Sequence, residues 1–154
     1  RNFRAHIAAA RETGLPLIVH ARDADTDTAD ILEDEMKNGA FPGLIHCFTA
    51  GPELAKRALD IGFYISISGI ATFKNAETLR QTILTVPEDR LLVETDSPYL
   101  APVPHRGKRN EPSFVADTAG ALASLFGTDF ETLAARTTDN FYRLFTKAPH
   151  REIQ

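Results

Sequence analysis

At residues 91–100 the sequence is Leu-Leu-Val-Glu-Thr-Asp-Ser-Pro-Tyr-Leu, an apolar run that ends in two carboxylates and a proline turn. A short apolar run of this kind is typical of a buried strand, where carboxylates are costly unless cations or hydrogen bonds meet them. Side chains two residues apart share one face of a strand, so Glu94 and Asp96 are expected to point the same way at its carboxyl end. The segment therefore predicts a strand that presents acidic groups, as a metal site requires.

Three earlier segments have the composition of strands, and helical patterns separate them. The predicted strands are residues 15–20, 43–48 and 63–69. The last of these alternates apolar with polar side chains. Helical spacing occurs at residues 3–10, 31–36, 54–61 and 79–86, and again at 115–126 and 133–145. Strands that alternate with helices in this way indicate right-handed parallel βαβ units.

This order of elements predicts a single α/β domain over residues 1–154, with about four parallel strands flanked by helices. Four strands cannot close an eight-stranded barrel, which typically needs about 250 residues. The chain is therefore expected to form either an open parallel sheet or about half of a barrel. A proline-bearing loop follows Asp96, and Asn75 is placed to cap the helical pattern of residues 79–86.

Composition limits the possible settings of the protein. Of its 154 residues 43% are hydrophobic, enough for a substantial core, and its net charge of −4 gives no general attraction to nucleic acid or anionic membranes. The single cysteine, Cys47, excludes an internal disulfide and suits a reducing compartment, so the cytoplasm is expected. No apolar stretch approaches the roughly 20 residues of a membrane span. The chain starts without Met, in a helical pattern, which suggests that a preceding segment has been removed.

Metal-binding side chains end several predicted strands, where parallel α/β folds place their active sites. The polar residues at this position are His20, His46, Ser68 and Asp96. Imidazole and carboxylate together suit zinc, manganese or iron, and carboxylates also suit magnesium. For His20 alone a structural hydrogen-bonding role is the alternative, but three such groups on one rim favour a metal site. We therefore predict that His20, His46 and Asp96 bind metal.

Two neighbours of these residues have other expected roles. Glu94 either pairs with a buried Arg or Lys, or lies behind the ligands and orients one of them or a water; it is not expected to bind metal itself. Cys47 should face the side of its strand opposite His46, as a small buried residue rather than a reactive thiol. The sequence contains no Gly-x-Ser-x-Gly elbow, Gly-rich phosphate loop or paired-cysteine zinc motif.

Several basic residues follow the predicted strands and are candidates for binding substrate phosphate. Arg supplies forked hydrogen-bond donors for phosphate oxygens and Lys supplies a point charge. The candidates are Arg22, Lys74, Arg106, Lys108 and Arg109. An ordinary salt bridge is the alternative for Arg22, and a solvated basic turn is the alternative for residues 104–112. Tyr99 could support a base or sugar, although packing is the simpler role.

Three segments resemble signature segments of the TatD family of metal-dependent hydrolases. They are Pro16-Leu-Ile-Val-His-Ala-Arg-Asp-Ala24, Ile45-His-Cys-Phe-Thr49 and Val93-Glu-Thr-Asp-Ser-Pro-Tyr-Leu-Ala-Pro102. The loop at residues 105–112 also resembles that family's loop, and the resemblance extends to about residue 145. It implies a TIM barrel of the amidohydrolase type that cleaves DNA phosphodiesters with divalent metal ions, often by removing nucleotides from 3′ ends.

By position, the resemblance assigns His20 and His46 to one metal ion and Asp96 to the other, with Asp96 also the catalytic residue that helps to deprotonate water. Two ions of Mg, Mn or Zn are implied per complete site. The family's His-x-His pair and bridging Glu lie on earlier strands, and no His-x-His occurs in this sequence. A smaller departure is Ala50, where the family usually has Gly. The resemblance therefore implies the C-terminal part of such a barrel, without its N-terminal strands.

These departures set the expectations for the chain by itself. We expect residues 1–154 to be inactive or weakly active on DNA, and to pair with another copy or with an N-terminal fragment that covers the open edges. Two other functions are open at this point. One is a non-catalytic half-barrel that serves as a binding or assembly module, and the other is an amidohydrolase-type enzyme that acts on an ester, amide or lactone.

Overall fold

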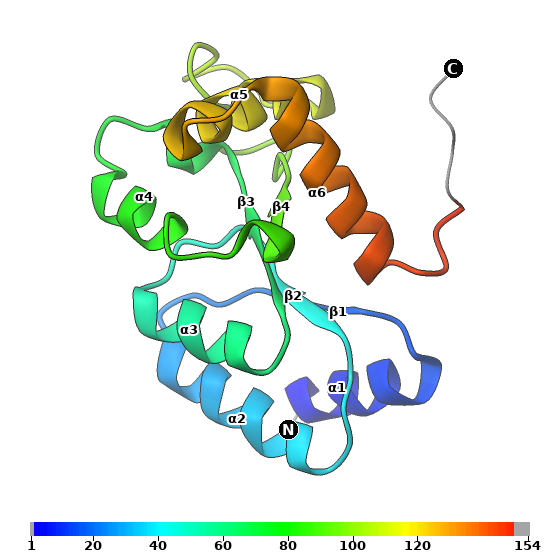
Figure 1. The fold of residues 1–154 in the computed structure, drawn as a ribbon. Helices are drawn as coiled ribbons and strands as arrows, with labels where there is room; N and C mark the ends of the chain where they lie inside the picture. The colour runs from blue at the N-terminus through cyan, green and yellow to red at the C-terminus, as the bar shows by residue number, and fades with distance from the viewer. Residues whose placement is uncertain (1, 150–154) are drawn as a thin grey trace.

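The computed structural model describes residues 2–149, in which helices alternate with four short strands (Figure 1). The elements in chain order are α1 (Asn2–Thr13), β1 (Leu17–Val19), α2 (Asp25–Lys37), β2 (Gly43–Ile45), α3 (Pro52–Asp60), β3 (Tyr64–Ile67), the 3₁₀ turn η1 (Gly69–Thr72), α4 (Glu77–Ile83), η2 (Glu88–Arg90), β4 (Leu91–Val93), η3 (Pro112–Phe114), α5 (Val115–Phe126) and α6 (Phe130–Leu144). Among these residues no helix is both long and apolar enough to cross a membrane.

The four strands form one sheet in the order β1-β2-β3-β4, and every neighbouring pair is parallel. This confirms the predicted βαβ units. Because all strands run the same way and neighbours in sequence are neighbours in the sheet, their carboxyl ends lie along one edge. That edge carries the loops with the predicted metal ligands.

Each strand is shorter than the sequence predicts, and at β2 and β4 the cause is that residues just past the carboxyl end leave the extended conformation. Cys47 and Asp96 have positive φ angles of 44° and 59°, which strand geometry does not allow. The ladder still continues for one bond past β2 and β4. The His46 N–H donates to a carbonyl of β1 at 2.8 Å, and the Glu94 N–H donates to a carbonyl of β3 at 3.0 Å. These two bonds fix the backbone of both residues against the sheet.

The two faces of the sheet are covered differently. On one face, side chains such as Ile45 and Ile65 pack with α1 to α5 in the main core. On the other, Leu44 and Leu92 form a small cluster with Leu144 of α6. In Figure 1, α2 and α3 lie on one side of the sheet and α6 on the other. All four residues of β3 are therefore buried, including Ser66, although apolar and polar residues alternate along this strand.

The face toward α6 is only partly covered. Ile18 on β1 is 60% exposed and Phe141 on α6 is 41% exposed. Between the sheet and α6 lies an apolar groove of about 670 Å³, which we call the inner groove, and it is lined by Ile18, Leu44, His46, Ser66, Leu92, Val93, Glu94, Val115, Thr137, Thr138, Phe141, Tyr142 and Phe145. The inner groove thus begins at His46 and Glu94 and follows the sheet beneath α6.

One predicted helix cap is wrong. Asn75 does not cap α4, because the helix starts after Ala76 and no side chain caps it. The backbone closes the turn instead, with the Ala76 N–H donating to the Phe73 carbonyl at 3.0 Å. The structure has a side-chain cap at α6, where the Asp129 carboxylate accepts the Thr132 N–H at 2.7 Å.

Candidate metal centre

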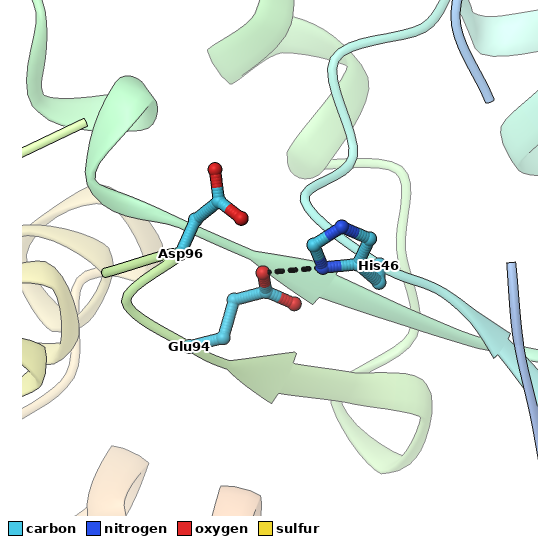
Figure 2. Close-up of side chains that lie close together, drawn as sticks. All are labelled: His46, Glu94 and Asp96. Atoms are coloured by element: carbon cyan, nitrogen blue, oxygen red, sulfur yellow. Dashed lines mark hydrogen bonds and ion pairs between the residues drawn. The ribbon is translucent and has the colours of Figure 1, made fainter. Parts of the chain in front are cut away.

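Three side chains from the carboxyl ends of β2 and β4 converge at the edge of the sheet (Figure 2). His46, Glu94 and Asp96 each offer a nitrogen or oxygen atom, and these atoms lie within 4.8 Å of one another. All three side chains are partly buried, so the group is shielded but reachable from solvent. One imidazole and two carboxylates at this spacing form a donor set that suits a divalent cation.

Hydrogen bonds separate the role of Glu94 from that of Asp96. The Glu94 Oε1 atom lies 2.8 Å from His46 Nδ1, and Oε2 accepts the Cys47 N–H at 3.1 Å. An ionised carboxylate can only accept, so Nδ1 carries the imidazole proton and Nε2 keeps its lone pair for a cation. Among the described residues Glu94 has no Arg or Lys partner, which leaves the role of orienting His46.

His20 lies beside this group rather than inside it. Its ring centroid is 5.4 Å from that of His46, with the planes inclined at 42°. His20 is exposed, and it is not among the three residues whose donor atoms come within 4.8 Å of one another. The structure therefore places the two predicted histidine ligands side by side at the ends of adjacent strands, with His46 nearer to the carboxylates.

A polar cavity of about 930 Å³ opens on the other side of Asp96 from the inner groove. It is lined by His20, Ala21, Arg22, Asp23, Asp25, Thr26, Cys47, Thr49, Ala50, Gly51, Ile70, Asp96, Tyr99 and Leu100. His46 and Glu94 line the inner groove instead, so the converging group stands between the two hollows. Asp23 and Asp25 were not predicted as site residues. Their signal in the sequence was an Asp-x-Asp pair directly after the His20 strand.

Cys47 is buried, as predicted, and it lines the polar cavity, whereas His46 lines the inner groove. Because the φ of Cys47 is positive, the alternation of side chains along the strand does not continue to this residue. The Cys47 Sγ atom, in the wall of the polar cavity, lies 3.2 Å from Ser68 Oγ. Burial, with smaller contributions from the negative charges of Asp96 and Glu94, raises the pKa of the Cys47 thiol to about 11. The thiol therefore stays protonated near neutral pH, as expected for a packing residue.

The structure brings only some of the predicted phosphate-binding residues to the cavity. Arg22 lines the polar cavity and is mostly exposed, with Asp23 at 4.0 Å as a loose partner. Arg106 lies over the Phe73 ring, with its guanidinium carbon 3.6 Å from the ring centroid. The remaining candidates, which are exposed and do not line the polar cavity, are Lys74, Lys108 and Arg109.

The comparisons with known proteins agree with the geometry. The family model described as "TatD related DNase" matches residues 1–146. The chain belongs to the TatD family. It is 58% identical over 144 residues to the uncharacterized metal-dependent hydrolase YcfH of Escherichia coli K12, covering 94% of this chain and 54% of that protein. It is 33% identical to the 3′-5′ ssDNA/RNA exonuclease TatD of Klebsiella pneumoniae, over 93% of this chain and 56% of that protein.

A solved TatD structure decides between the two predicted architectures. The crystal structure of YJJV, a TatD homologue from Escherichia coli K12, superposes with a TM-score of 0.83 at 26% identity, covering 93% of this chain and 54% of that one. The parallel sheet is therefore part of a TatD-type TIM barrel rather than a complete open sheet. The chain spans about half the length of the relatives it matches.

One buried residue that shapes this TatD site was missed by sequence reasoning. Asn110 is 3% exposed, and its amide donates to the carbonyls of Thr95 and Tyr99 at 2.8 and 2.6 Å. Its backbone N–H donates to the Pro98 carbonyl at 3.0 Å. These bonds enclose the turn in which Asp96 has its left-handed backbone. Asn110, in the loop of residues 104–112 that we call the basic loop, thus fixes the turn that carries Asp96, a role that its position in the sequence did not reveal.

Proposed function

We propose that the protein is a divalent-metal-dependent hydrolase that cleaves phosphodiester bonds of DNA, shortening strands from their 3′ ends. The observation that carries this proposal is the convergence of His46, Glu94 and Asp96 at the ends of parallel strands in a TatD-family chain. The Klebsiella relative, named as a 3′-5′ exonuclease of single-stranded DNA and RNA, supports the choice of substrate.

The donor groups fit divalent cations. His46 Nε2 is left free by the bond from Nδ1 to Glu94, and the neighbouring His20 ring offers a second imidazole. His20 and His46 would hold one cation, and the Asp96 carboxylate would hold the other. Imidazole and carboxylate donors suit Zn²⁺ and Mn²⁺, and carboxylate oxygen suits Mg²⁺.

The side chains of this chain then have distinct roles in hydrolysis. When bound, the cations supply Lewis-acid stabilisation of the phosphoryl oxygens and activate the attacking water. Asp96 accepts the proton of that water, and Glu94 keeps His46 in one tautomer and orientation. Arg22, in the wall of the polar cavity, binds a phosphate oxygen. The basic residues assigned to more distant phosphates of the strand are Lys74, Arg106, Lys108 and Arg109.

The inner groove is where we expect the incomplete set of metal ligands to be completed. It is apolar, it begins at His46 and Glu94, and it leaves Ile18 on the edge strand uncovered. Because the relatives are about twice as long as this chain, we propose that an N-terminal segment covers the groove and adds the remaining metal ligands. A second copy of the chain is the alternative occupant, and light scattering would detect it as a dimer. Residues 1–154 alone are then expected to have weak activity or none.

The test uses the longest reading frame that contains this sequence. With Mn²⁺ or Mg²⁺, single-stranded DNA labelled at its 5′ end should give a ladder of fragments shortened from the 3′ end, and EDTA should abolish it. Residues 1–154 alone, assayed in parallel, should give much less product. A p-nitrophenyl carboxylate ester serves as the comparison substrate. Hydrolysis of this ester without shortening of DNA would overturn the proposal, and so would shortening that is insensitive to EDTA.

A further inference from the structure

A second hollow adjoins the polar cavity, on the side of α3 and α4, which are neighbours at the left of Figure 1. We call it the uncharged pocket. It has a volume of about 480 Å³ and is lined by Thr49, Ala50, Gly51, Ile70, Phe73, Asn75, Ala76, Thr78, Leu79 and Thr82. Four of these residues, Thr49, Ala50, Gly51 and Ile70, also line the polar cavity. The two hollows are therefore separated only by the loop after β2 and by Ile70.

The two hollows differ in the chemistry of their walls. The polar cavity carries two basic or imidazole groups, Arg22 and His20, together with the carboxylates of Asp23, Asp25 and Asp96. The uncharged pocket has no Asp, Glu, Lys, Arg or His among its lining residues. Its walls are aliphatic and aromatic, and the only side-chain polar groups are one amide and three hydroxyls. A ligand that occupies both hollows must therefore join a charged part to a neutral, largely apolar part.

The aromatic wall of the uncharged pocket is held in place before any ligand binds. Arg80 on α4 donates to the carbonyls of Ala71 and Phe73 at 3.0 and 2.8 Å, and Glu77 pairs with the same guanidinium. From the basic loop, the Arg106 guanidinium covers the Phe73 ring. Phe73 is thus fixed through its backbone and its ring. A preorganised aromatic wall loses little entropy when a planar group binds against it.

From these observations we propose that the uncharged pocket binds the base of the nucleotide whose phosphate occupies the polar cavity. This inference rests on the proposed function and adds to it a site for the base. A nucleobase is planar and uncharged, with hydrogen-bonding groups only at its edge. Such a group matches apolar walls with an aromatic ring and a few amide and hydroxyl groups. Asn75, at the rim, is the residue placed to bond the base edge.

The experiment compares two substrates that share a leaving group. Thymidine 5′-(p-nitrophenyl phosphate) carries a nucleoside, and methyl p-nitrophenyl phosphate carries a methyl group in its place. The protein is the longest reading frame that contains this sequence, with Mn²⁺. Thr78→Phe fills the pocket from an exposed position on α4. Ser124→Phe is the matched control, because it adds the same group at an exposed helix position lining a different hollow.

In the unaltered protein, kcat/KM should be higher for the nucleoside substrate than for the methyl substrate by about 10-fold or more, the range expected from stacking one base. Thr78→Phe should remove most of that preference without changing kcat/KM for the methyl substrate. Ser124→Phe should keep the preference for the nucleoside substrate. Asn75→Ala, a smaller change, should reduce the preference in the same direction. If Thr78→Phe is unstable on heating, Asn75→Ala decides the question.

The possible failures can be told apart. If the unaltered protein does not shorten DNA with Mn²⁺, the proposed function fails and the base site fails with it. If it shortens DNA, but shows no preference for the nucleoside substrate or keeps the full preference in the Thr78→Phe and Asn75→Ala proteins, the proposed function stands and the base site is wrong.

Discussion

Asp96→Asn is expected to lower the rate of metal-dependent DNA shortening by about 100-fold or more. Replacing a residue that only orients a metal ligand already costs about 10- to 100-fold, and Asp96 is assigned both to a cation and to the attacking water. The amide keeps the shape of the carboxylate but loses its charge and its ability to take up a proton. The measurement is the initial rate at saturating Mn²⁺, with 5′-labelled single-stranded DNA.

Asp60→Asn is the matched control for this variant. Asp60 is an exposed carboxylate on α3 that pairs with Lys56 and lines neither the polar cavity nor the inner groove. Its replacement therefore changes the net charge by the same amount outside the site. An exposed substitution of this kind should change stability by no more than about 0.5 kcal/mol, and its activity should match that of the unaltered protein. Full activity in a correctly folded Asp96→Asn protein would contradict the assignment of Asp96.

Gly69→Ala is expected to lower the free energy of unfolding by about 2–3 kcal/mol, as overpacking of a close contact does. A Cβ atom at Gly69 would lie 2.3 Å from the Leu100 carbonyl oxygen and 2.9 Å from the Pro102 nitrogen. Both are backbone atoms, so no side chain can rotate out of the way. The segment that must move follows Asp96 directly, so the affinity for Mn²⁺ should fall as well.

Gly120→Ala is the matched control, and we expect it to raise the free energy of unfolding rather than lower it. A Cβ atom there meets nothing within 4 Å, and the residue lies inside α5. Replacing a helical Gly by Ala at an open position should stabilise the protein by up to about 1 kcal/mol. Urea unfolding of the two variants measures both effects. Equal stability of Gly69→Ala and the unaltered protein would show that residues 100–102 do not pack closely against Gly69.

The sequence was sufficient to predict the elements that depend on local patterns of apolar residues. Runs such as residues 91–93 are buried in the sheet because they have no other way to remove their side chains from water, and the helices between them follow from their spacing. The convergence of His46 with Asp96 was predictable for a related reason. Parallel strands place their carboxyl ends at one edge, so residues at those ends meet without any knowledge of side-chain packing.

What the sequence did not predict depends on contacts between distant segments. Asn110 bonds to carbonyls 15 and 11 residues earlier in the chain, and only the folded loop shows that it encloses Asp96. The sequence predicted that Cys47 is buried and turned away from His46, but not that its backbone has a positive φ or that it lines the polar cavity beside Asp96. The uncharged pocket was not predicted either, because its walls come from segments that are separate in the sequence, the loop before α3 and the helix α4.

The central claim is that His46 binds one divalent cation and Asp96 a second, while Glu94 orients His46. Anomalous X-ray diffraction from crystals of the longest reading frame, soaked in Mn²⁺, tests it most directly. We predict an anomalous peak within bonding distance of the Asp96 carboxylate or of His46 Nε2, with Glu94 still bonded to His46 Nδ1. A peak bound to Glu94 with His46 turned away, or no peak at this edge of the sheet, would contradict the account.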